Sequence, residues 1–157
     1  MTTTPTIEDT ITFIKAAHAG QVDKGGVEYW KHPVSVMRRL GPDASDDCRL
    51  VALLHDVIED TGTTADDLLR RGYPQGVVAA VQRLTKPKGI PYLDCIRAIV
   101  ASGDRMAIAV KLADNQDNLD PDRLAKLSPE KRGGDEKYRR SIDILAAAIS
   151  RRPASGS

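Results

Sequence analysis

The sequence predicts an all-α fold, and three observations carry that prediction. Apolar residues recur at helical spacing along most of the 157-residue chain. No alternating strand pattern of useful length appears between these periodic segments. Glycine and proline residues fall at the boundaries of the segments, where they are typical of helix ends and connecting loops.

The composition limits the class of protein. Hydrophobic residues make up 41% of the chain and charged residues 29%, which is typical of a soluble globular protein. The 23 basic and 22 acidic side chains nearly cancel, so no overall field attracts nucleic acid or a membrane. Aromatic residues are only 4%, which argues against a platform that stacks nucleic-acid bases.

The same features predict the organisation and location of the chain. No apolar run approaches the roughly 18 residues of a membrane span, and the N-terminus lacks the basic and apolar regions of a secretion signal. We therefore expect a cytoplasmic protein with one domain at residues 1–150 and a disordered tail at 151–157. The sequence does not predict an oligomeric state.

The first helices follow from capping residues and punctuation. Thr6 is expected to cap a helix that ends near residues 18–20, because isoleucines recur at helical spacing after it. Residues 21–31 contain two adjacent glycines and predict a loop. A second helix is expected to begin at His32, with Pro33 at the favoured first helical position, and to stop at Gly41.

Asp46 is a good N-cap for a third helix, which we expect to run to about Asp60. Lys86 and Lys88, in a loop predicted at 85–92, could meet an anionic substrate, although solvated loop lysines are the commoner arrangement. The other predicted helices span about 63–71, 74–84, 93–101, 104–118, 121–127 and 138–149. Asp104 is expected to cap the helix at 104–118.

The segment 50–62, with sequence LVALLHDVIEDTG, places four polar groups in an apolar helix. His55 and Glu59 are four residues apart, as are Asp56 and Asp60, so each pair is expected to share one helix face. Burying these groups among leucines is unfavourable unless they are paired, hydrogen-bonded or bound to a metal. This segment is therefore the first candidate for a site of chemistry.

Two further positions extend this set. His32 precedes the second helix, and Asp114 closes the apolar run of the helix at 104–118. Two imidazoles and two carboxylates suit Mn²⁺, Fe²⁺ or Zn²⁺ better than Ca²⁺. Four protein ligands can leave positions open for water and substrate, which is typical of a catalytic rather than a structural metal.

The order of these residues resembles that of the HD superfamily of metal-dependent phosphohydrolases. The chain is more closely similar to the (p)ppGpp hydrolase domains of the RelA/SpoT homologues, especially their small alarmone hydrolase branch. The resemblance implies an HD-domain bundle of about eight to ten helices. The matching phrases cover the chain from about Ala16 to Ile149, in the family's order: AAHAGQVDKGGVEYWKHP, VALLHDVIEDTGTT, VQRLTK, VKLADNQDNL and EKYRR.

The resemblance also implies roles for single residues. Glu59 and Asp60 match the acidic pair that orients or deprotonates the attacking water, and which of them is the base is left open. The implied metal is Mn²⁺, with another divalent transition metal as the alternative. The implied metal ligands are His32, His55, Asp56 and Asp114, and the implied substrate-binding residues are Lys24, Asn118 and Tyr138.

The activity implied is hydrolysis of the 3′-diphosphate of the alarmone (p)ppGpp to GDP or GTP and pyrophosphate, as in the stringent response. The chain is too short for the synthetase domain of the bifunctional relatives, so only hydrolysis is expected. Two departures leave the substrate open: Asp23 replaces the arginine common before Lys24, and the residues between Asp114 and Asn118 are altered. The alternatives are another phosphorylated nucleotide, or a non-catalytic HD domain that binds a nucleotide to regulate a partner.

Overall fold

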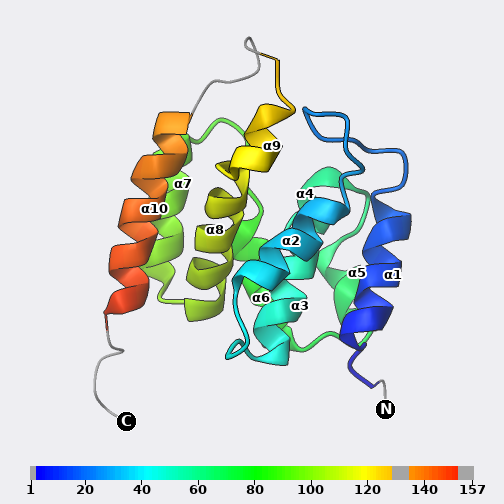
Figure 1. Cartoon of the computed structure of the whole chain (residues 1–157). Helices are drawn as coiled ribbons and strands as arrows, with labels where there is room; N and C mark the ends of the chain where they lie inside the picture. Colours follow the sequence, from blue (N-terminus) through cyan, green and yellow to red (C-terminus); the bar gives the residue numbers. More distant parts are fainter. Residues whose placement is uncertain (1–2, 129–134, 152–157) are drawn as a thin grey trace.

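The computed structural model describes residues 3–128 and 135–151, and the regular structure of this part is helical (Figure 1). A single isolated β-bridge joins Val22 to Glu28. The all-α prediction is confirmed. Most of the tail expected at 151–157 lies outside the described residues. The helices are α1 Ile7–Ala17, α2 Lys31–Arg39, α3 Asp46–Leu54, α4 Val57–Asp60, α5 Ala65–Arg70, α6 Gln75–Leu84, α7 Tyr92–Ser102, α8 Arg105–Asn118, α9 Pro121–Ala125 and α10 Asp135–Ser150.

Helix α8 lies at the centre of the bundle. It packs against α10 and α7 on one side and against α2, α3 and α6 on the other (Figure 1). Because neighbours surround α8, side chains such as Ala107 and Val110 are fully buried, although the helix has no strongly one-sided apolar face. Its last two turns carry polar residues, and Asp114, Asn115 and Asp117 are buried there. Among the described helices, none is long and apolar enough to cross a membrane.

Local capping sets several helix boundaries as predicted. Thr6 and Asp9 form a capping box at the start of α1, in which each side chain accepts a backbone N–H of the other residue. The side chain of Asp104 accepts from Ala107 N at the start of α8. Each cap contributes about 1 kcal/mol to helix stability. The prediction for Pro33 was wrong, because α2 begins two residues earlier, at Lys31.

The helix predicted from Asp46 to Asp60 is broken at its centre. Ser45 caps α3, which ends at Leu54, and α4 begins only at Val57. The ring of His55 lies 2.6 Å, through Nδ1, from the carbonyl oxygen of Ala52, which a continuous helix would pair with the N–H of residue 56. The side chain thus competes with the helical hydrogen bond at the break.

This break corrects the sequence interpretation of the segment 50–62. His55 and Asp56 lie in the junction between α3 and α4, so the pairs with Glu59 and Asp60 do not stack on one continuous helix face. Glu59 and Asp60 are exposed, not buried. His55 alone of the four is fully buried, with 2% of its surface accessible.

Candidate metal centre and nucleotide pocket

Three segments bring the four predicted metal ligands together. His32 comes from α2, His55 and Asp56 from the α3–α4 junction, and Asp114 from α8. One ligand atom from each of His32, His55 and Asp56 lies within 4.8 Å of the others. The Oδ1 atom of Asp114 lies 2.8 Å from His32 Nε2 and 3.6 Å from His55 Nε2. The arrangement is a buried cluster of two imidazoles and two carboxylates.

The hydrogen bonding of His55 tests whether a metal fits this cluster. Nδ1 donates to the carbonyl oxygen of Ala52, so the lone pair of the neutral ring is on Nε2. That Nε2 atom is buried without a hydrogen-bond partner in the part of the chain that the structure describes, and it lies 3.1 Å from a carboxylate oxygen of Asp56. A lone pair facing carboxylate oxygens is repulsive until a cation lies between them. The donor set therefore fits a divalent metal ion.

The carboxylate of Asp117 orients His32 through Nδ1, the ring nitrogen that does not face Asp114. His32 Nδ1 lies 2.6 Å from Asp117 Oδ2, and the other oxygen of Asp117 accepts from Ser35 Oγ at 2.6 Å and from Arg39 Nε at 3.0 Å. Burial opposes the ionisation of Asp117, but the hydrogen bonds from His32 and Ser35 outweigh it and hold its pKa below the usual range. Partners of this kind fix the tautomer and direction of a ligating histidine. Sequence reasoning assigned no role to Asp117, although its spacing of three from Asp114 was visible.

The two carboxylate ligands also have partners outside the cluster. The hydroxyl of Tyr29 donates to Asp56 Oδ2, and Lys111 Nζ lies 3.0 Å from Asp114 Oδ2. Burial lowers the pKa of His55, but the neighbouring charges of Asp56 and Asp114 outweigh it and raise that pKa well above its usual value. The pKa of His32 is raised as well. Without a metal, the carboxylates favour protons on both rings.

The acidic pair on α4 divides into two different environments. Glu59 Oε1 accepts a hydrogen bond from the backbone N–H of Lys86 at 2.6 Å, which ties α4 to the loop before α7. Partial desolvation and repulsion from Asp56 and Glu59 raise the pKa of Asp60. The pKa of Asp60 is therefore shifted in the direction that a general base requires.

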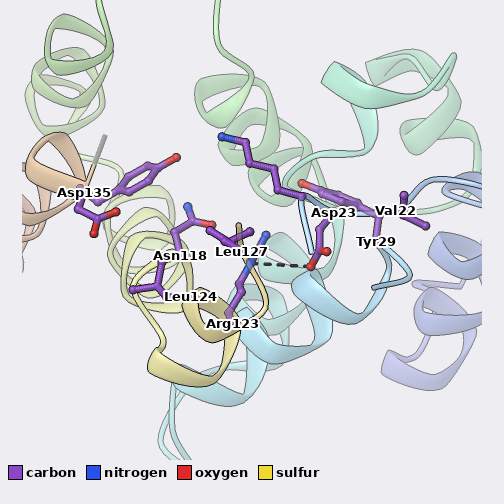
Figure 2. Close-up of a pocket in the computed structure, with 10 residues that line it drawn as sticks. Val22, Asp23, Tyr29, Asn118, Arg123, Leu124, Leu127 and Asp135 are labelled. Carbon is purple, nitrogen blue, oxygen red and sulfur yellow. Dashed lines mark ion pairs between the residues drawn. The ribbon is translucent and has the colours of Figure 1, made fainter. Parts of the chain in front are cut away.

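A cavity of about 270 Å³ is lined by all three residues predicted to bind substrate, Lys24, Asn118 and Tyr138 (Figure 2). Tyr29 lines it, and the same tyrosine donates to Asp56, so the cavity adjoins the metal ligands. The loop at 21–31 forms one wall, and α8, α9 and α10 supply the others. The lining residues are Val22, Asp23, Lys24, Tyr29, Asn118, Arg123, Leu124, Leu127, Asp135 and Tyr138.

Asp23, the residue that departs from the family pattern, is largely engaged within its own loop. Its Oδ1 accepts from the backbone N–H groups of Gly25 and Val27 at 2.8 and 2.9 Å. Its Oδ2 forms an ion pair with Arg123, 3.9 Å from Nε (Figure 2). Arg123 also lies 3.1 Å, through Nη1, from Asp117. Sequence reasoning missed Arg123, which supplies a guanidinium to a pocket that lacks the expected arginine.

Comparisons with known proteins identify relatives of this chain. No protein-family model matches the chain. A GTP pyrophosphokinase of Streptomyces coelicolor is 30% identical over 142 residues, which are 85% of this chain and 16% of that protein. A guanosine-3′,5′-bis(diphosphate) 3′-pyrophosphohydrolase of Aquifex aeolicus is 32% identical over 120 residues, 72% of this chain and 17% of that protein. The chain thus spans under a fifth of these two relatives.

A shorter relative and a solved structure are matched over more of their length. The guanosine-3′,5′-bis(diphosphate) 3′-pyrophosphohydrolase MESH1 of Danio rerio is 33% identical over 124 residues, which are 74% of this chain and 68% of that protein. A solved structure of a metazoan ortholog of SpoT has the same fold, with a TM-score of 0.71 and 21% identity over 94% of this chain and 87% of that one. The resemblance is confirmed: the chain belongs to the guanosine-3′,5′-bis(diphosphate) 3′-pyrophosphohydrolase family, in its small alarmone hydrolase branch.

Proposed function

We propose that this chain, acting as one domain over residues 1–150, hydrolyses the 3′-diphosphate of (p)ppGpp. Water oxygen bonds to the phosphorus attached to the 3′-oxygen, and the bond between that phosphorus and the 3′-oxygen breaks. The 3′-oxygen takes up a proton, which gives GDP or GTP and pyrophosphate. The observation that carries the proposal is the cluster around His55 Nε2, a buried ring nitrogen without a hydrogen-bond partner among the described residues, beside a cavity lined by the expected substrate-binding residues.

The two imidazole Nε2 atoms and the carboxylates of Asp56 and Asp114 would hold the metal. We favour Mn²⁺, because mixed imidazole and carboxylate ligands suit it. Such an ion lowers the pKa of water and offsets negative charge on phosphoryl oxygens. Asp117 holds the ring of His32 and Lys111 holds the carboxylate of Asp114, so the ligands need little rearrangement on binding.

Asp60 is our choice for the general base that removes a proton from the attacking water. Its pKa is raised, so its carboxylate is a stronger base than an unperturbed one. Glu59 is already an acceptor for Lys86 N and is better suited to hold the loop and orient the water. The assignment thus follows from the different environments of two adjacent carboxylates.

The cavity would take the nucleoside. Lys24 would offset charge on the phosphoryl oxygens, Asn118 would hydrogen-bond the ribose and Tyr138 would pack against the nucleoside, since all three line this cavity. The ion pair of Asp23 and Arg123 places an acceptor and a donor beside each other in the cavity lining. Because this pair differs from the usual loop arginine, another phosphorylated nucleotide is the second candidate substrate.

Product analysis tests the proposal. The Mn²⁺-loaded protein is incubated with ppGpp, pppGpp and a panel of other nucleotides, and release of pyrophosphate and orthophosphate is measured. We expect pyrophosphate from ppGpp and pppGpp, abolished in Asp56→Asn and retained in Asp47→Asn, an exposed acid on α3. Orthophosphate from another nucleotide would favour the second candidate. No turnover with any divalent metal would favour a regulatory domain.

A further inference from the structure

Three ammonium groups converge on the ring of Tyr92. The Nζ atoms of Lys86, Lys111 and Lys137 lie 5.8, 5.3 and 5.1 Å from its centroid. They come from separate parts of the chain: the loop before α7, the middle of α8 and the first turn of α10. Lys137 also lies 5.2 Å from the ring of Tyr138. The cluster is therefore a product of the tertiary fold.

The positive charge of this cluster is only partly compensated. Lys111 pairs with Asp114 at 3.0 Å. Within residues 3–128 and 135–151, neither Lys86 nor Lys137 forms an ion pair with a carboxylate. Cation–π attraction holds each ammonium near the ring, but the ammonium groups repel one another. An anion placed among them would remove that repulsion.

Tyr92 is fixed in a position that connects the cluster to the nucleotide cavity. Its hydroxyl donates to Asn115 Oδ1 at 2.6 Å, and its ring meets Tyr138 edge-to-face with centroids 5.8 Å apart. Tyr138 lines the nucleotide cavity. Lys86, Tyr92 and Lys111 line a second cavity of about 410 Å³. Tyr92 thus lines one cavity and Tyr138 the other, and the contact between their rings lies between the two cavities.

The cluster also adjoins the metal centre. Lys111 contacts Asp114, and Glu59 binds the backbone of Lys86. A nucleotide that carries phosphate chains on both its 3′- and 5′-oxygens can place only one chain at the metal. With the nucleoside beside Tyr138, the other chain needs a separate positively charged surface within reach, and the lysines around Tyr92 supply one.

We propose that Lys86 and Lys137, whose ammonium groups both lie near the ring of Tyr92, bind the 5′-phosphate chain, which is not cleaved. This rests on the proposed function, since it assigns the second phosphate chain of the same substrate. Lys111 contributes charge but remains committed to Asp114. The subsite would select nucleotides with phosphates at both positions over nucleoside 3′-diphosphates with a free 5′-hydroxyl.

A substrate-by-variant comparison tests the subsite. The doubly substituted protein Lys86→Gln/Lys137→Gln is compared with the unsubstituted protein on ppGpp and on guanosine 3′-diphosphate, which has a free 5′-hydroxyl. We expect the double substitution to raise KM for ppGpp about tenfold or more, with little change in kcat, because charge-assisted hydrogen bonds are lost. KM for guanosine 3′-diphosphate should be high in both proteins and unaffected by the substitutions.

Lys88→Gln is the matched control, because Lys88 lies in the same loop but, among the described residues, is not one of the lysines whose ammonium lies over the ring of Tyr92. Equal changes in KM for both substrates, or no change for ppGpp, would overturn the subsite while leaving the hydrolase activity intact. Failure of the unsubstituted protein to hydrolyse either substrate would instead overturn the proposed function and the subsite together. Thermal unfolding of each variant confirms that these exposed substitutions leave the fold unchanged.

Discussion

His32 Nε2 lies 2.8 Å from Asp114 Oδ1, although the two residues are 82 positions apart in the chain. The contact joins α2 to α8. Each partner has a second contact, because His32 Nδ1 lies beside Asp117 Oδ2 and Lys111 Nζ donates to Asp114 Oδ2. Half of the candidate metal centre is therefore built by two packed helices. The other half depends on the break between α3 and α4.

Removal of the carboxylate behind His32 should weaken metal binding. In Asp117→Asn the hydrogen bond to Nδ1 loses its charge, and such partners typically account for 10–100-fold in metal affinity. We expect Mn²⁺ affinity, measured by titration calorimetry, to fall by about that factor. Asp120→Asn is the control, because Asp120 pairs with Arg39 on the exposed side of the same network. Equal affinities in the two variants would show that Asp117 does not support the site.

Lys111→Met should destabilise the metal-free protein more than the metal-loaded one. Lys111 is largely buried, and its loss leaves the Asp114 carboxylate without its main cationic partner. Breaking a buried pair in this way costs about 3–5 kcal/mol. A metal ion at Asp114 replaces part of the lost charge, so Mn²⁺ should reduce the deficit in chemical denaturation. A deficit of the same size with and without Mn²⁺ would place the metal away from Asp114.

The stabilisation by Mn²⁺ should increase with pH. In the metal-free protein the pKa values of His32 and His55 are raised, so protonated rings stabilise the fold at low pH, and this contribution is lost as pH rises through the raised values. Metal binding requires neutral rings, so protons compete with it. We expect a larger rise in Tm on adding Mn²⁺ at about pH 8 than at about pH 6. The reverse order would exclude both histidines as ligands.

The two acids on α4 should differ in their effect on catalysis. Asp60→Asn removes the proposed base and should lower kcat by about 10²–10⁴-fold, the usual contribution of general base catalysis. Glu59→Gln retains an oxygen that can accept from Lys86 N and should lower kcat less. Steady-state rates at saturating ppGpp distinguish them. A greater loss of kcat in Glu59→Gln would reverse the assignment.

Local signals explain how much of the fold was predictable. The apolar period and the caps at Thr6 and Asp104 depend on residues within one turn, and both caps occur as predicted. The break at His55 was not predictable from the spacing of apolar residues, because it involves a hydrogen bond from the His55 ring to the carbonyl oxygen of Ala52. Apolar residues continue at helical spacing on both sides of His55, so the sequence pattern gives no sign of the break.

The candidate site was predictable to a different extent. The resemblance named the four ligands, and the fold brings them together. Asp117 and Arg123 were missed because their partners lie on distant segments: Asp117 meets His32 across 85 residues. The lysines around Tyr92 likewise converge only through the packing of α7, α8 and α10.

Hydrolysis in heavy-oxygen-labelled water shows which bond of ppGpp is broken. The Mn²⁺-loaded protein is given ppGpp, and both products are analysed by mass spectrometry. If water attacks phosphorus at the 3′-diphosphate, pyrophosphate carries one labelled oxygen and GDP carries none. Label in GDP, or release of orthophosphate in place of pyrophosphate, would exclude attack of water on the phosphorus attached to the 3′-oxygen.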